Sequence, residues 1–117
     1  MGLDMGIHRK VRENTNEALL NKLEGKKEVV EIAYWRKFWE LQNAIGEIID
    51  EDIENCKGCE LNEDNIRSII SWLDENRDNK DINQWNRGDT NNDIELLNKV
   101  LKETDFKLYK LVYSGWW

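Results

Sequence analysis

The strongest periodic pattern in this chain lies in residues 30–49, VEIAYWRKFWELQNAIGEII. At 100° per residue, one narrow polar stripe is formed by Arg36, Glu40, Asn43 and Glu47. The opposite side is a broad apolar arc that includes Trp35, Phe38 and Trp39. The pattern predicts a single helix over the whole stretch. Because the arc is wider than a surface helix needs, we expect this helix to be central to the fold or to reserve half of its apolar face for a partner.

The two ends of the chain carry strand signals. Residues 1–11 alternate between apolar and polar side chains, which is the pattern of a half-buried strand. Residues 105–117 are rich in β-forming residues with apolar side chains on both sides, which indicates a strand that is covered on both faces or paired centrally with the first strand. Residues 57–61 are predicted to form either an exposed turn or a third, short edge strand.

Further helices are predicted from capping residues. Asn14 with Glu17, followed by a leucine stripe and a glycine, predicts a short helix over residues 14–25. Asn62 caps a helix predicted to end near Asn76, and Thr90 caps a last helix. The polar residues 77–92 between these two helices indicate a long loop.

These elements place the chain in the α+β class. We expect a small antiparallel sheet that contains the N- and C-terminal strands, packed against about four helices. The length of 117 residues suits one domain, and no internal repeat or linker divides it. We therefore treat residues 1–117 as a single α+β domain.

Charge is distributed very unevenly along the chain. The chain has 24 acidic and 17 basic residues. Residues 47–64 hold eight of the acids and one of the bases, so the rest of the chain has sixteen acids and sixteen bases. The whole formal charge of −7 therefore resides in this segment. We interpret its first part as an acidic patch that docks on a basic surface, with one isoleucine as an apolar anchor. The acidic patch consists of Glu47, Asp50, Glu51, Asp52, Ile53 and Glu54. The structural alternative is a solvated helix end and turn.

The same charge balance restricts the partners and the location. Direct binding to nucleic acid or to an anionic membrane is disfavoured, because phosphates would approach like charge. The chain has no apolar run long enough for a transmembrane helix, and residues 1–12 lack the apolar block of a secretory signal. A cytoplasmic location is expected.

Candidate catalytic and metal-binding residues are few. Cys56 and Cys59 have CxxC spacing, but two cysteines and a single histidine, His8, do not complete a zinc site. The neighbouring carboxylates Glu54 and Glu60 would raise the thiol pKa, which disfavours redox catalysis. We interpret the pair as two reduced cysteines in a turn. We predict no catalytic residue, no metal and no cofactor, so the protein is not expected to be an enzyme.

The aromatic residues support an alternative function. In the predicted helix, Trp35 and Trp39 would lie one turn apart, with Tyr34 and Arg36 beside them, and could form a stacking surface for a small ligand such as a nucleotide signal. The structural alternative is a hydrophobic core. Two further indoles, Trp116 and Trp117, should point to opposite faces of the last strand, so one is expected to be exposed or to lie against a partner.

Four short motifs, spread in order over most of the chain, resemble a family of small, uncharacterised proteins found in phages and prophages. They are the opening Met-Gly-Leu-Asp-Met, the string Glu31-Ile32-Ala33-Tyr34-Trp35-Arg36-Lys37, the pair Asn55-Cys56 before a capped helix, and the aromatic ending Tyr113-Ser114-Gly115-Trp116. The chain departs from the family pattern at Gly6, where an aromatic residue is usual, and in a shortened loop before the last helix. The resemblance implies a phage or mobile-element origin and an α+β domain, and it carries no catalytic residues over.

Together these observations favour a non-enzymatic interaction protein of a phage or mobile element. Its expected partner is a host protein with a basic surface, and its location is the cytoplasm of the host cell. Enzymes that handle nucleic acid have basic channels, and the acidic patch could occupy one by presenting carboxylates in place of phosphates. We therefore expect an inhibitor of a host nucleic-acid-handling or defence system, such as a CRISPR nuclease. Self-association is left open.

Overall fold

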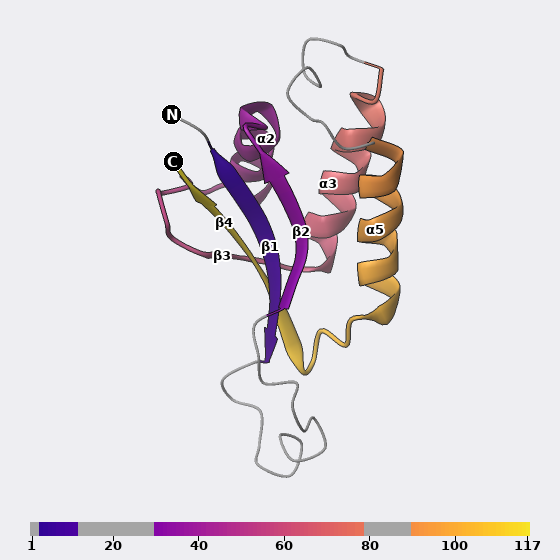
Figure 1. The fold of residues 1–117 in the computed structure, drawn as a ribbon. Helices are drawn as coiled ribbons and strands as arrows, with labels where there is room; N and C mark the ends of the chain where they lie inside the picture. The colour runs from indigo at the N-terminus through magenta and orange to yellow at the C-terminus, as the bar shows by residue number, and fades with distance from the viewer. Residues whose placement is uncertain (1–2, 12–29, 79–89) are drawn as a thin grey trace.

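A four-stranded antiparallel sheet forms the centre of the molecule (Figure 1). The computed structural model describes residues 3–11, 30–78 and 90–117. The strands are β1 (Asp4–Val11), β2 (Val30–Arg36), β3 (Cys59–Leu61) and β4 (Tyr109–Trp116), and their order in the sheet is β2-β1-β4-β3. The N- and C-terminal strands pair with each other in the middle of the sheet. The predicted α+β class and the central pairing of the two ends are confirmed.

Three helices are present in the described part of the chain, where about four were expected. They are α2 (Trp39–Ile49), α3 (Glu63–Glu75) and α5 (Thr90–Glu103). In Figure 1, α3 and α5 lie side by side along the sheet, and α2 lies near the end of the sheet where both termini are found. The helix predicted over residues 14–25 and most of the loop predicted over 77–92 lie outside the described residues. Residues 90–92 of that loop belong to α5.

The prediction of one helix over residues 30–49 is wrong in its first half. Residues 30–36 form the edge strand β2, and the helix begins only at Trp39. Between them, Lys37 has a positive φ of 59°, and its N–H donates to the carbonyl of Leu3 at 2.6 Å. The segment VEIAYWR contains β-branched and aromatic residues, which fit a strand as well as a helix when both sides of the pattern are apolar. Pairing with β1 decides between the two, because it gives the backbone of β2 its hydrogen-bond partners.

The core lies between the helices and one face of the sheet. Alternate residues of the strands point to this face, among them Met5, Trp35 and Tyr113, all of which are buried. The apolar faces of the helices close the other side. The fully buried helix side chains among the described residues are Leu41, Ile45, Ile66, Ile69, Leu73 and Leu97. In a two-layer α+β fold, the sheet and the helices each turn one apolar face toward the other layer, and this buries their apolar surface.

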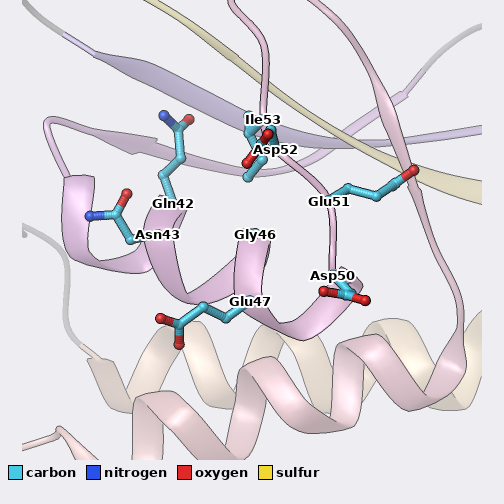
Figure 2. A pocket seen from close by; sticks show the side chains of 8 residues that line it. All are labelled: Gln42, Asn43, Gly46, Glu47, Asp50, Glu51, Asp52 and Ile53. Atoms are coloured by element: carbon cyan, nitrogen blue, oxygen red, sulfur yellow. The ribbon is translucent and has the colours of Figure 1, made fainter.

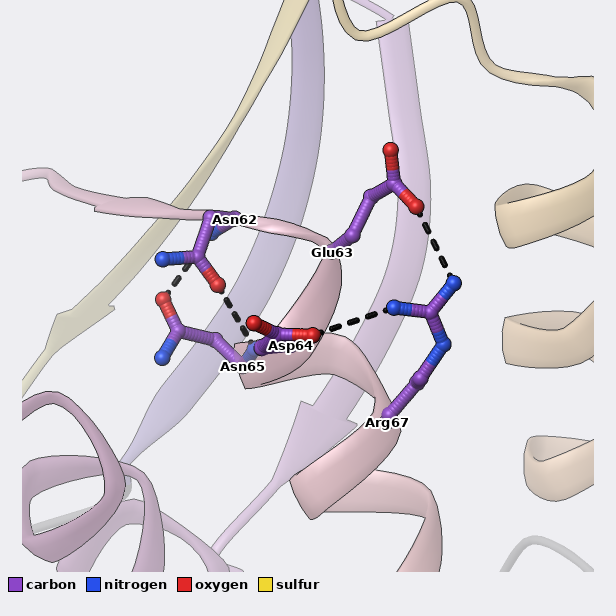
Figure 3. A network of polar contacts seen from close by, with 5 residues as sticks. All are labelled: Asn62, Glu63, Asp64, Asn65 and Arg67. Atoms are coloured by element: carbon purple, nitrogen blue, oxygen red, sulfur yellow. Dashed lines mark hydrogen bonds and ion pairs between the residues drawn. The ribbon is translucent and has the colours of Figure 1, made fainter.

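The start of α3 follows the sequence closely (Figure 3). The Asn62 side chain accepts a hydrogen bond from the backbone N–H of Asn65 at 2.8 Å, and the Asn65 side chain accepts one from the N–H of Asn62 at 2.9 Å. This reciprocal pair satisfies two N–H groups at the helix end. Glu63 and Asp64 lie in the first turn, where negative charge is favourable, and both pair with Arg67. The predicted cap at Asn62 is confirmed.

Candidate functional site

The acidic patch begins where α2 ends in a Schellman motif. Asp50 adopts a left-handed conformation with φ 54° and ψ 44°. Its N–H donates to the carbonyl of Glu47 at 3.3 Å, and the N–H of Glu51 donates to the carbonyl of Gly46 at 3.1 Å. This motif normally has glycine in the left-handed position. Here the position carries an acid beside the negative end of the helix dipole, with no basic residue in the last turn. Local energetics disfavour that choice.

Replacing Asp50 with glycine is therefore expected to stabilise the protein by about 1 kcal/mol, because glycine adopts the left-handed conformation without steric cost and the unfavourable charge is removed. Urea unfolding followed by circular dichroism would measure the change. The variant Asp50→Asn separates the two causes, since it removes the charge and keeps a side chain, and we expect roughly half of the gain. A loss of stability in Asp50→Gly would contradict this account of the helix end.

The chain after α2 is held firmly against the end of β4. The side chain of Ile53 packs on the hydrophobic core. The Asn55 side chain then makes two hydrogen bonds to the backbone of Trp117, donating to its carbonyl at 3.1 Å and accepting from its N–H at 2.9 Å. The N–H of Cys56 donates to the carbonyl of Gly115 at 2.8 Å. The acids between Asp50 and Asn55 are thus carried on a backbone that is fixed at both ends.

Two hollows flank this backbone. The larger, of about 820 Å³, lies beside α2 and is shown in Figure 2. Its lining residues are Gln42, Asn43, Gly46, Glu47, Asp50, Glu51, Asp52 and Ile53. The smaller, of about 280 Å³, is lined by Glu51, Asp52, Glu54 and the turn that carries the cysteines. Glu51 and Asp52 line both hollows, so the acidic patch forms the ridge between them.

The carboxylates of the acidic patch are exposed and largely uncompensated. Glu54 pairs with Lys57 at 3.3 Å, and both side chains are mostly exposed to solvent. Within residues 3–11, 30–78 and 90–117, no basic side chain forms an ion pair with Glu47, Asp50, Glu51 or Asp52. Glu63 and Asp64 differ from them, because Arg67 neutralises both. The acidic run over 47–64 therefore divides into an uncompensated patch and a compensated helix start.

The carboxylates surround the larger hollow without meeting at one point. Figure 2 shows Glu47 and Glu51 extending away from each other on either side of the end of α2. Among the described residues, no group of three or more His, Cys, Asp or Glu side chains could hold a metal ion. Charges that are spread over a surface suit a partner that also presents several charges, and do not suit a single small cation.

The aromatic residues of the alternative function do not share a surface. Trp35 is 4% exposed in the core, where its Nε1–H donates to Asp93 of α5 at 3.1 Å. Tyr34 and Arg36 point to the other face of β2 and are exposed, and the Tyr34 hydroxyl donates to Asp4. Trp39 lies at the start of α2. The predicted spacing of one helical turn between Trp35 and Trp39 is wrong, because Trp35 belongs to the strand β2 and Trp39 is the first residue of the helix α2.

The C-terminal indoles are partly buried. Trp117 packs on the core and meets Trp39 edge-on, with ring centroids 5.6 Å apart. Trp116 is also of intermediate exposure and lies on β4, opposite Asp4 of β1. Trp116 is the last residue of β4 and Trp117 follows it, so the alternation of the strand does not extend to the second indole. The Trp39–Trp117 pair adjoins the acidic patch, because the backbone of Trp117 holds Asn55.

His8 and the cysteines have structural surroundings. His8 faces Glu31 across β1 and β2, with Nε2 3.5 Å from a carboxylate oxygen. Cys56 is exposed in a left-handed turn conformation with φ 65°, and Cys59 is partly buried at the start of β3. Burial raises the pKa of the Cys59 thiol, and the carboxylates of Glu51 and Glu54 raise it further against the opposing effect of Lys57. Neither cysteine forms a disulfide; Cys56 lies in a turn as predicted, whereas Cys59 is the first residue of β3 and not part of a turn.

This raised pKa predicts slow alkylation of Cys59. Only the thiolate reacts, and a higher pKa lowers the thiolate fraction at any pH below it. In a Cys56→Ser variant, the rate of reaction with iodoacetamide should reach half its maximum at a higher pH than for a free cysteine. Glu51→Gln should lower that midpoint, whereas Glu63→Gln, on α3, should leave it unchanged. Equal midpoints in all three proteins would contradict the electrostatic contribution.

Three residues of the site were given no role in the site from the sequence. Gln42 lies between Phe38 and Ile45 on the side of the helical pattern that is otherwise apolar. This was the available signal, since a buried amide needs a specific partner. It is 5% exposed, and its Oε1 accepts a hydrogen bond from the Tyr113 hydroxyl at 2.6 Å. The role of Asn55 depends on Trp117, which is 62 residues away, and that of Gly46 depends on the chain that returns past it. Neither could be found from a local pattern.

Comparison with protein-family models, curated proteins and solved structures finds no match to this chain. Among the helices in the described ranges, none combines the length and apolar character that crossing a membrane requires.

Proposed function

We propose that this protein is a non-enzymatic interaction protein that binds a basic surface of another protein through its acidic patch. The observation that carries the proposal is the anchored, uncompensated display of Glu47, Asp50, Glu51 and Asp52. Their backbone is tied by the Schellman motif at one end and by Asn55 at the other. A fixed backbone reduces the ordering cost of binding, and uncompensated charges steer a cationic partner toward the patch.

The partner class follows from the charge pattern. Several exposed carboxylates on one surface can replace phosphates in a cationic channel, so proteins that bind nucleic acid offer matching surfaces. The resemblance to small phage proteins favours a host defence enzyme, such as a CRISPR nuclease, within this class. In this proposal the protein inhibits its partner by competing with DNA or RNA for the channel, and it acts in the cytoplasm of the host cell.

The use of an acid in the left-handed position after α2 supports binding over a purely solubilising role. A solvated helix end would tolerate glycine at Asp50 and basic residues in the last turn, and both would be more stable. Local sequence choices that reduce stability are common at functional sites. The alternative of an aromatic ligand site has no comparable support, because its four residues lie in the core, on the open face of β2 and on α2.

The test compares two variants with equal changes of charge. The first neutralises the acidic patch by the substitutions Asp50→Asn, Glu51→Gln, Asp52→Asn and Glu54→Gln. The second neutralises four exposed acids on α3 and α5 by the substitutions Asp74→Asn, Glu75→Gln, Glu95→Gln and Glu103→Gln. Each protein is added to a panel of nucleases, CRISPR nucleases included, and cleavage of target nucleic acid is measured together with binding at several salt concentrations.

For a nuclease that the unmodified protein inhibits, neutralising the patch should weaken binding roughly tenfold or more and flatten its salt dependence, since each exposed ion pair contributes up to about 1 kcal/mol. The control variant should bind about as well as the unmodified protein. Equal effects of the two variants, or an unchanged salt dependence, would reject the acidic patch as the binding surface.

A further inference from the structure

We propose that Cys56 and Cys59 form a peroxide-sensitive switch, in which an intramolecular disulfide releases the clamp that holds the chain after α2 against β4. In this clamp, the Asn55 side chain holds the backbone of Trp117. The N–H of Cys56 donates to the carbonyl of Gly115. The effect of the switch on partner binding rests on the proposed function, whereas the formation of the disulfide does not.

The backbone places the two cysteines almost within disulfide distance. The N–H of Cys56 donates to the carbonyl of Gly115 at 2.8 Å, and Cys59 lies opposite Tyr113 in the pairing of β3 with β4. Gly115 and Tyr113 are two residues apart on β4, so the two cysteines lie beside positions about 7 Å apart along that strand. Disulfides join Cα atoms that are about 4.4–6.8 Å apart. A small movement of the turn is therefore enough to join the thiols.

Cys56 is the residue that moves when the turn tightens. Cys59 is fixed by strand pairing, and Gly58 packs so closely on β4 that a Cβ atom there would lie 2.7 Å from Cγ1 of Val112. The usual Cα separation in a disulfide is about 5.5–6 Å, so Cys56 has to approach Cys59 by about 1 Å. That shift stretches its 2.8 Å hydrogen bond to Gly115 beyond the usual range of about 2.7–3.2 Å.

The thiol of Cys56 also belongs to the clamp. It donates to Oδ1 of Asn55 at 3.4 Å, and the same oxygen accepts the N–H of Trp117 at 2.9 Å. Oxidation removes the thiol proton, so the contact with Asn55 is lost. With both contacts of Cys56 gone, Asn55 is held less firmly, and the acidic patch loses one of its two fixed ends.

Both thiols can be reached from solvent. Cys56 is exposed, and Cys59 is partly buried but lines the smaller hollow. The same hollow is lined by Glu51, Asp52 and Glu54, which repel anionic oxidants such as glutathione disulfide. Hydrogen peroxide is neutral, so these carboxylates do not repel it. A peroxide is therefore the oxidant that suits this site.

The oxidation takes two displacement steps. The sulfur of Cys56 attacks one oxygen of the peroxide, the O–O bond breaks, and a sulfenic acid and one water form. The sulfur of Cys59 then attacks the sulfur of Cys56, the S–O bond breaks, and the disulfide and a second water form. The two thiol protons leave in the two waters, and the peroxide takes two electrons from the sulfurs. Excess thiol reverses the reaction by thiol–disulfide exchange.

Intact-mass spectrometry of the protein treated with dilute hydrogen peroxide tests the disulfide. The unmodified protein should lose two hydrogens and stay a monomer, and dithiothreitol should restore them. Cys59→Ser retains the exposed thiol and lacks the second one, so it should stop at the sulfenic acid, which dimedone traps. Covalent dimers in place of the intramolecular disulfide, or equal dimedone trapping in the two proteins, would overturn the inference.

Hydrogen exchange of single amides, followed by NMR, tests the release of the clamp. In the oxidised protein the amides of Cys56 and Trp117 should exchange about tenfold faster or more than in the reduced protein. The amide of Asn65, in the cap of α3, serves as an internal reference and should not change. Peroxide-treated Cys56→Ser keeps a hydroxyl donor beside Asn55 and cannot form the disulfide, so it should exchange as the reduced protein does.

A disulfide that leaves the exchange of the Cys56 and Trp117 amides unchanged would overturn the switch. Neither measurement involves a partner, so this failure leaves the proposed function standing. Conversely, if the charge-neutralised variants reject the acidic patch as a binding surface, the disulfide and its effect on amide exchange still stand.

Discussion

Replacing Gly115 with alanine is expected to lower the free energy of unfolding by about 3 kcal/mol. A Cβ atom on Gly115 would overlap Oε1 of Gln42 and would lie 3.2 Å from the Tyr113 hydroxyl. The new methyl group would force the amide away and break the buried hydrogen bond between Gln42 and Tyr113. Urea unfolding followed by tryptophan fluorescence would measure the loss.

The double variant Gly115→Ala with Gln42→Ala isolates the cause. If the clash is with the amide, the alanine at Gly115 should cost less than about 1 kcal/mol in the shortened Gln42 background. An equal loss of stability in both backgrounds would show that the clash with the Gln42 amide is not the cause. The carbonyl of Gly115 also accepts from Cys56, so we expect the single variant to loosen the acidic patch as well as the core.

Phe38→Ala is expected to cost about 4 kcal/mol, whereas Trp39→Ala should cost about 1 kcal/mol. The two aromatic residues are adjacent in the sequence, but they differ in burial. Phe38 is fully buried at the turn between β2 and α2, with its ring 5.9 Å from that of Trp72. Trp39 is partly exposed and makes an edge contact with Trp117. Chemical denaturation of both variants would measure the difference.

Comparing Phe38→Ala with Trp39→Ala also tests whether residues 30–36 form a strand that ends before the helix α2 begins. In one continuous helix over residues 30–49, Trp35 and Trp39 would share the buried side, and losing the larger indole would be costly. Similar losses in the two variants, or a larger loss in Trp39→Ala, would contradict the fold described for this segment. Tyr34→Ala, on the open face of β2, serves as a further control and should have a small effect.

Several elements could be predicted because their signals are local. The alternation of Leu3, Met5 and Ile7 on one side of residues 1–11 is visible in the sequence and is the side that the core buries. Asn62 and Thr90 are residues that favour helix starts; α3 begins directly after the Asn62 cap, and Thr90, predicted as a cap, is the first residue of α5. Such signals depend on neighbours within a few residues, so they do not require knowledge of the rest of the chain.

The candidate site could be predicted only in part. The acidic composition of residues 47–64 is a property of the sequence, and the exposure of the patch follows from it. The sequence did not show which of these acids would be neutralised. Arg67 pairs with Glu63 and Asp64. Glu47 and the acids at 50–52 have no such partner among the described residues. The hollow beside α2 requires the chain after Asp50 to return past Gly46, which is a tertiary contact.

The sequence alone determined the α+β class, the strands at both ends, the starts of α3 and α5, and the concentration of negative charge after α2. Only the tertiary structure decided that residues 30–36 are a strand, that Gln42 pairs with the buried hydroxyl of Tyr113, and that Asn55 ties the acidic patch to Trp117. The physical reason is the range of the interactions involved. Capping and periodicity act over a few residues, whereas backbone pairing with β1 and the buried contacts to β4 join groups that are far apart in the chain, and their free energy overrides local preference.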